Sequence, residues 1–177
     1  MAITDILPDV VAPDLDILFC GTAAGSASAR RGAYYAGPGN AFWPTLHRVG
    51  LTPRALAPEE FPRVIDWKIG LTDLAKTVSG SDLVLDKVHF NAARLSALVL
   101  HYQPRCLAFT SKRAAQEFLG RPVGYGLMTT SLGATRLFVL PSPSGAARGS
   151  WDEGHWRSLA AMRRAVFGGW TALAPGE

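Results

Sequence analysis

Small residues between apolar and aromatic stretches mark the part of this chain best suited to bind a ligand. The apolar run at residues 17–20 leads into a turn, G-T-A-A-G at residues 21–25, and two aromatics follow at Tyr34 and Tyr35. Such a turn can point backbone N–H groups at an anion or a carbonyl oxygen. A flat ring nearby offers a face to a planar base. These residues favour a base or nucleotide site, although a glycine turn can simply end a strand and tyrosines can simply pack.

The elements that must position these residues alternate between strand and helix. Strands are expected at residues 17–20, 68–71 and 106–109, with a hairpin formed by 127–130 and 135–140. Helices are expected at residues 41–49, 58–65, 87–102, 110–118 and 155–167. This order predicts an α/β fold, a three-layer α/β/α domain with a short, mostly parallel central sheet. Ligands bind such sheets at the carboxyl ends of the strands, so residues 21–25, 72–73, 110–112 and 142–148 should converge.

Length and composition set the broad class. The 177 residues suit one domain, and 48% apolar with 18% charged residues is a globular balance. Residues 1–15 hold Pro8, Pro13 and several acids, and are expected to form an irregular surface arm. No apolar run reaches the roughly 20 residues of a membrane span. No basic residue precedes Arg30, which disfavours a signal peptide and favours a cytoplasmic, nucleoid-associated protein.

Cysteine and histidine usage argues against a metal or cofactor. Cys20 and Cys106 both lie in apolar runs, so they are expected to be reduced thiols in the core. Two cysteines are too few for an iron–sulfur cluster or a structural zinc site. The four histidines have no metal-ligand spacing. The formal net charge of +4 comes with basic residues in turn-like stretches, which permits contact with nucleic acid.

Four motifs give the chain a family resemblance. They are F-C-G-T-A-A-G, Y-A-G-P-G-N-A-F-W, F-T-S-K-R-A and L-P-S-P-S-G-A-A-R, in that order along the chain. In order and spacing the chain resembles the uracil-DNA glycosylase superfamily over residues 15–167, most closely its mismatch-specific uracil/thymine branch. The resemblance implies a monomeric enzyme that flips uracil out of DNA and hydrolyses its glycosidic bond without metal or cofactor, leaving an abasic site.

The resemblance also assigns roles to individual positions. The turn would hold the base and the reacting centre, and Tyr35 would stack on the base. Asn40 could read the base edge or cap the following helix, and Ser142 could contact a base oxygen or serve as a turn residue. The base-binding set is Gly21, Thr22, Ala24, Gly25, Tyr35, Asn40 and Ser142. The DNA-binding set is Ser111, Lys112, Pro143, Ser144, Gly145, Ala146, Ala147 and Arg148.

The departures from the family pattern concern the chemistry itself. Ala23 stands where the branch has its catalytic asparagine, and Ser142 stands where a second asparagine is usual. Glycosidic cleavage develops positive charge on the sugar and negative charge on the base, so a nearby carboxylate can stabilise the reaction. Asp82, in a loop with Gly80, is the preferred substitute. Asp73, at a strand end, is the second choice and could instead be a structural cap, and it is also open that neither acts.

The loop at residues 142–148, called the second loop below, indicates which substrates are preferred. Ala146 stands in place of a bulkier apolar residue and fills less of the gap left by a flipped base. We therefore expect a preference for weakened pairs such as guanine–uracil, or for single-stranded DNA. No lysine lies in the turn motif, so a lyase step is not expected.

Two other functions stay open from the sequence. Ala23 also fits a very slow or non-catalytic binder of uracil-containing or abasic DNA. A phosphate-binding turn at residues 21–25 would fit a nucleotide enzyme, but no Gly-Lys-Ser/Thr motif and no acid about 20 residues further on support that reading.

Overall fold

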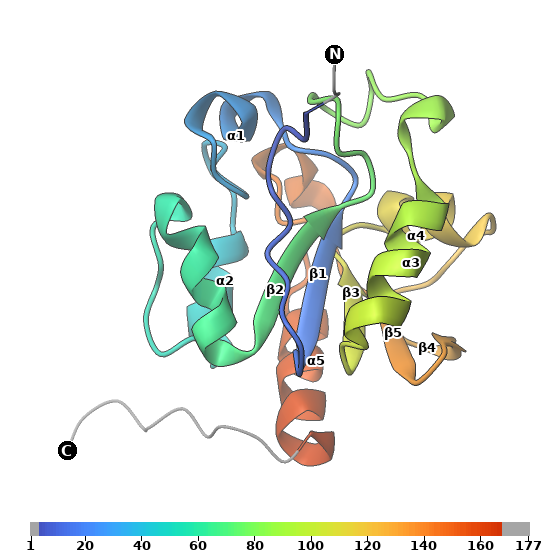
Figure 1. Cartoon of the computed structure of the whole chain (residues 1–177). Helices are drawn as coiled ribbons and strands as arrows, with labels where there is room; N and C mark the ends of the chain where they lie inside the picture. Colours follow the sequence, from blue (N-terminus) through green and yellow to red (C-terminus); the bar gives the residue numbers. More distant parts are fainter. Residues whose placement is uncertain (1–3, 168–177) are drawn as a thin grey trace.

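The computed structural model describes residues 4–167, which form a sheet with helices on both of its faces (Figure 1). The sheet order is β2-β1-β3-β5-β4, and only β4 runs antiparallel to its neighbour. The mostly parallel sheet is therefore confirmed. The strands are β1 Ile17–Gly21, β2 Ile69–Asp73, β3 Cys106–Phe109, β4 Gly126–Leu132 and β5 Thr135–Val139.

The central strand β1 shows why helices cover both faces. All five of its residues are buried, and side chains alternate between faces, so Ile17 and Phe19 join one hydrophobic cluster while Leu18 and Cys20 join the other. The first cluster is completed by α2 Phe42–Arg48, the 3₁₀ helix η1 Pro58–Trp67 and α5 Glu153–Val166. The second is completed by α3 Ala92–Tyr102 and α4 Lys112–Leu119. The three-layer α/β/α arrangement is confirmed.

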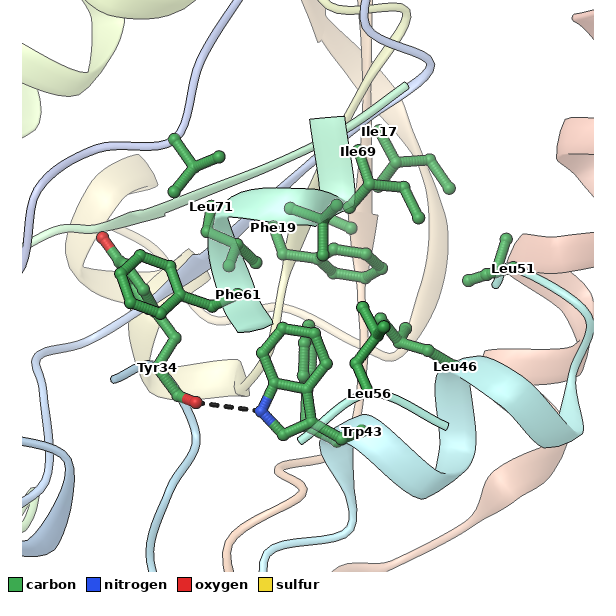
Figure 2. Packing of buried hydrophobic residues seen from close by; sticks show 14 of the residues in the cluster. Ile17, Phe19, Tyr34, Trp43, Leu46, Leu51, Leu56, Phe61, Ile69 and Leu71 are labelled. Atoms are coloured by element: carbon green, nitrogen blue, oxygen red, sulfur yellow. Dashed lines mark hydrogen bonds between the residues drawn. The ribbon is translucent and has the colours of Figure 1, made fainter. Parts of the chain in front are cut away.

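Close packing around Tyr34 fixes the chain segment that leads into the binding region. The Trp43 indole N–H donates to the Tyr34 carbonyl oxygen at 2.9 Å, and both side chains pack among apolar neighbours in the first cluster (Figure 2). The Tyr34 and Phe61 rings meet edge to face at 5.4 Å. Tyr34 is therefore tied to α2 and η1.

Several local expectations need correction. The helix expected over residues 87–102 is divided into η2 Lys87–His89 and α3, because the Asn91 side chain accepts a hydrogen bond from the Arg94 N–H and caps a new helix start. Two short helices were not predicted, α1 Ser26–Arg31 and η3 Gly145–Ser150. Both cysteines are buried free thiols, as expected.

The prediction that the N-terminal segment is only a surface arm is wrong for part of its described residues. Residues 4–15 are irregular, but Leu7, Val10 and Leu15 are buried in the core, and Val10 pairs with Leu71 in an antiparallel bridge. This segment therefore covers the free edge of β2, which would otherwise present unpaired backbone groups.

Candidate functional site

The turn after β1 is held by backbone hydrogen bonds to the chain that follows β2. The carbonyl oxygens of Gly21 and Thr22 accept from the N–H groups of Leu74 and Ala75 at 2.9 and 2.7 Å. The Ala24 carbonyl accepts from the Gly80 N–H at 2.9 Å, which fastens the loop that follows. The turn therefore has a fixed shape set by the edge of the sheet.

A pocket of about 670 Å³ opens at this edge, where the carboxyl ends of β1, β2, β3 and β5 meet. The helix α2 that follows β1 packs in the first cluster, whereas the helix α4 that follows β3 packs in the second, on the opposite face of the sheet. The pocket therefore lies at a topological switch point. The predicted convergence of the four strand ends is confirmed. Among the predicted site residues, the pocket is lined by Gly21, Thr22, Ala23, Ala24, Gly25, Tyr35, Asn40, Asp73, Asp82, Ser111, Ser142, Pro143, Ser144, Gly145, Ala146 and Ala147.

Tyr35 packs inside the protein and also lines the pocket. Its ring stacks on Phe42 with a 3.8 Å centroid separation, and its hydroxyl lies 3.1 Å from the Thr110 hydroxyl. Burial raises the pKa of the Tyr35 phenol well above its usual value, so it stays neutral. Its backbone has φ +51°, an uncommon conformation for a bulky residue. Tyr35 also lines the pocket, so packing on Phe42 fixes a ring that a base can contact.

Two carboxylates occupy different depths of the pocket. Asp82, on the loop after β2, accepts a hydrogen bond from the Thr22 hydroxyl at 2.7 Å, which places it beside the turn that contains Ala23. Asp73 ends β2 opposite Gly21 and is 5% exposed. A Cβ on Gly21 would lie 2.8 Å from the Asp73 Oδ1, so only glycine leaves room for the carboxyl group.

Burial raises the pKa of Asp73 to about 7, with Asp9 adding to this effect and Lys76 and Arg94 opposing it. A pocket carboxyl group that changes protonation near neutral pH is a common feature of functional sites. The two roles that the sequence leaves open for Asp73, a catalytic carboxyl group and a structural cap, are both compatible with its position at the end of β2.

A partly buried polar network next to the pocket is not expected from the sequence. Asp9 accepts from the Thr72 hydroxyl at 2.6 Å and pairs with Lys76 at 2.9 Å and Arg94 at 2.7 Å. Burial acts to raise the pKa of Asp9, but these partners together lower it, so the carboxylate is ionised. The Arg94 guanidinium also donates to the Asp73 carbonyl oxygen at 2.8 Å. The network therefore fixes the backbone that carries Asp73.

Asn40 and Ser142 each make a local hydrogen bond while lining the pocket. The Asn40 Oδ1 accepts from the Phe42 N–H at 3.0 Å, although by backbone geometry Ala41 is the capping residue of α2. The Ser142 Oγ accepts from the Ser144 N–H at 3.2 Å, as expected of a turn residue. These bonds orient both side chains at the pocket wall.

The second loop packs directly on the glycine segment before α2. A Cβ on Gly145 would lie 2.8 Å from the Pro38 carbonyl oxygen, and a Cβ on Gly39 would lie 2.7 Å from the Arg148 guanidinium. The Ala41 N–H donates to the Pro143 carbonyl at 2.8 Å. The close approach of the Pro38 carbonyl therefore requires glycine at position 145, and the positive φ of +72° favours glycine at position 39. Ala146 and Ala147 line the pocket beside this contact.

Two of the predicted DNA-contacting side chains lie outside the pocket lining. Lys112 is exposed at the start of α4, with its Nζ 4.3 Å above the Tyr125 ring, and Arg148 is exposed on η3. Ser111 caps α4, its Oγ accepting from the Ala114 N–H at 3.1 Å. Lys112 and Arg148 therefore lie outside the pocket lining, whereas Ser111 is part of it.

A sequence model of the uracil DNA glycosylase superfamily matches residues 8–164. This chain belongs to that superfamily. It is also similar to the solution NMR structure of a "putative Uracil DNA glycosylase" from Methanosarcina acetivorans, with a TM-score of 0.65 and 25% identity. That match covers 89% of this chain and 95% of the other. The family supports action on DNA in repair.

Within residues 4–167, no group of three His, Cys, Asp or Glu side chains is arranged to hold a metal ion. No helix in the same range is long and apolar enough to cross a membrane.

Proposed function

We propose that this protein is a monofunctional uracil-DNA glycosylase of the mismatch-specific uracil/thymine branch, with Asp82 replacing the catalytic amide that Ala23 lacks. The observation that carries this proposal is the 2.7 Å hydrogen bond from the Thr22 hydroxyl to Asp82. It holds a carboxylate of a distant loop against the turn motif, at the wall of a pocket that Tyr35 also lines.

In the proposed reaction, the flipped uracil stacks on Tyr35 and its oxygens face the backbone N–H groups of the turn. The glycosidic bond breaks with its electron pair going to the base, which leaves as an anion stabilised by those donors. The sugar becomes an oxocarbenium-like cation, and the Asp82 carboxylate stabilises that positive charge. A water molecule then adds to the cation and loses its proton to Asp82 or to solvent.

Asp73 has a supporting role in this proposal. Because its pKa is raised to about 7, it is largely protonated below neutral pH and can then donate a hydrogen bond toward a base oxygen. Its position beneath Gly21 puts it at the floor of the pocket. A fully ionised carboxylate there would oppose the negative charge that develops on the leaving base.

A hydrolytic reaction without a lyase step is supported by the chemistry of the pocket wall. Lyase chemistry needs a free amine to form a Schiff base with the sugar. No lysine is among the described residues that line the pocket. The nearby Lys76 is buried and donates to the Leu7 carbonyl at 2.6 Å and to the Tyr34 hydroxyl at 3.1 Å. We accordingly propose hydrolysis alone, by a monomer acting on DNA of the cytoplasm and nucleoid.

The preference proposed for guanine–uracil pairs rests on Ala146. This residue is exposed at the pocket mouth but has a single methyl group, so it replaces little of the stacking lost when a base flips. Flipping costs least at mismatches and in single strands. Equal single-turnover rates for uracil opposite guanine and opposite adenine would contradict this preference.

A second candidate function is a slow or non-catalytic binder of uracil-containing or abasic DNA, favoured by the missing polar side chain at Ala23. Single-turnover excision from a guanine–uracil duplex in the presence of a chelator distinguishes the two. Uracil release supports the glycosylase, whereas tight binding without release supports the binder.

A further inference from the structure

The proposed chemistry does not use an apolar tip at the mouth of the pocket. Leu83 is 96% exposed and Val84 is 64% exposed, and Leu83 lines the same pocket as Asp82 and Ala146. Single exposed leucines are common on proteins. This pair is unusual because it borders the pocket and because the chain on both sides of it is fixed.

Hydrogen bonds anchor the tip on both sides. On the first side, the Asp82 carboxylate accepts from the Thr22 hydroxyl. The Arg113 guanidinium donates both to the Asp82 carbonyl and to the Leu85 carbonyl, the latter at 2.6 Å. Leu85, on the second side, is held both by this hydrogen bond and by the burial of its side chain, which is 5% exposed. Leu83 is therefore presented to solvent by an ordered turn, which the Val84 N–H closes on the Ser81 carbonyl at 3.0 Å.

We propose that Leu83 inserts into the DNA base stack beside the flipped nucleotide and supplies the apolar contact that the short Ala146 cannot. The inference rests on the proposed function, since it takes the pocket to receive a base. Proteins that kink or open a duplex often insert apolar side chains between base steps. Covering a fully exposed leucine with stacked bases removes most of its apolar surface from water, which favours the opened duplex.

The anchors of the tip connect insertion with catalysis. Thr22 and Arg113 hold Asp82, and Arg113 also holds the backbone on the other side of Leu83. Asp82 and Leu83 are adjacent in the chain and line the same pocket. The proposal therefore assigns Leu83 to duplex opening and not to bond cleavage.

This assignment predicts a dependence on the strength of the base pair. The variant Leu83→Ala should lose about tenfold or more in single-turnover excision of uracil opposite adenine, the change expected for losing burial of one leucine side chain. The loss should be smaller opposite guanine. Excision from single-stranded DNA should stay within about twofold of the wild type, because no pair has to be opened.

The experiment compares the wild type, Leu83→Ala and the control Leu100→Ala on all three substrates. Leu100 is a half-exposed leucine of α3 that does not line the pocket, so its truncation should change none of the rates. A second measurement follows the fluorescence of 2-aminopurine placed beside the uracil. The wild type should increase it on binding duplex DNA, and Leu83→Ala should increase it less.

Equal losses on duplex and single-stranded DNA, or no loss on either, would overturn the assignment. A change only in the association state of the protein would also overturn it and would indicate a protein contact at the tip. If the wild type releases no uracil from any substrate, the proposed function fails, and the fluorescence comparison still decides whether Leu83 opens the duplex.

Discussion

Replacing Asp73 by asparagine should make the protein more stable at alkaline pH. Asp73 is 5% exposed, and its pKa rises from the ordinary 3.8 to about 7 in the folded protein, mainly because of burial. Below about pH 4 both the folded and the unfolded states bind the proton. Between about pH 4 and pH 7 the unfolded chain releases it while the folded protein keeps it, so the free energy of unfolding falls as the pH rises.

The size of this effect follows from the two pKa values. A difference between 3.8 and about 7 is worth about 4 kcal/mol in total, of which about 2.5 kcal/mol falls between pH 5 and pH 8. Asparagine does not ionise, so Asp73→Asn should lack this loss. For a domain of this size the corresponding difference in Tm is roughly 5 to 10 °C.

The assay is urea unfolding of the wild type and Asp73→Asn at pH 5 and pH 8. The control is Asp66→Asn, the same substitution at a carboxyl group that the fold leaves exposed. A wild-type advantage over Asp73→Asn that grows from pH 5 to pH 8 would refute the reasoning, because it would mean that ionised Asp73 stabilises the fold through Lys76 and Arg94.

Three further predictions concern binding and stability. Tyr35→Ala should reduce excision about 10- to 100-fold in a single-turnover assay by removing the stacking face, whereas Tyr35→Phe removes only the contact with the Thr110 hydroxyl and should have a much smaller effect. Lys112→Ala should lower the slope of log Kd against log salt by about one, equally for all DNA sequences, in fluorescence anisotropy. Asp9→Ala leaves the buried Lys76 without its carboxylate and should cost about 3 to 5 kcal/mol in urea unfolding.

The fold could be predicted because its strands are short, apolar and separated by helix-forming segments. Residues 106–109 match β3 at both ends, and the strand order brings the predicted ends to one pocket. The break before α3 was missed because Asn91 acts through its side-chain cap, which an apolar stripe does not reveal. The N-terminal segment was misjudged because its buried residues, Leu7 and Val10, show no regular period.

The site could be predicted only in part. The turn at residues 21–25 and the loop at residues 142–148 could be expected at the pocket because each follows a strand, whereas Tyr35 was singled out through the family resemblance. The network of Asp9, Lys76 and Arg94 has no local spacing, because its members are far apart in sequence and meet only through the sheet edge. The burial of Asp73 likewise depends on the close approach of Gly21, which no composition or period indicates.

The most direct test of the proposed chemistry is single-turnover excision of uracil from a guanine–uracil duplex, comparing the wild type with Asp82→Asn. Asparagine keeps the size of the side chain and can still accept from the Thr22 hydroxyl, so the fold and DNA binding should be preserved. The rate should fall about 100-fold or more, the size of one lost transition-state contact. An unchanged rate with unchanged binding would contradict the role of Asp82 and leave Asp73 as the carboxyl group to test.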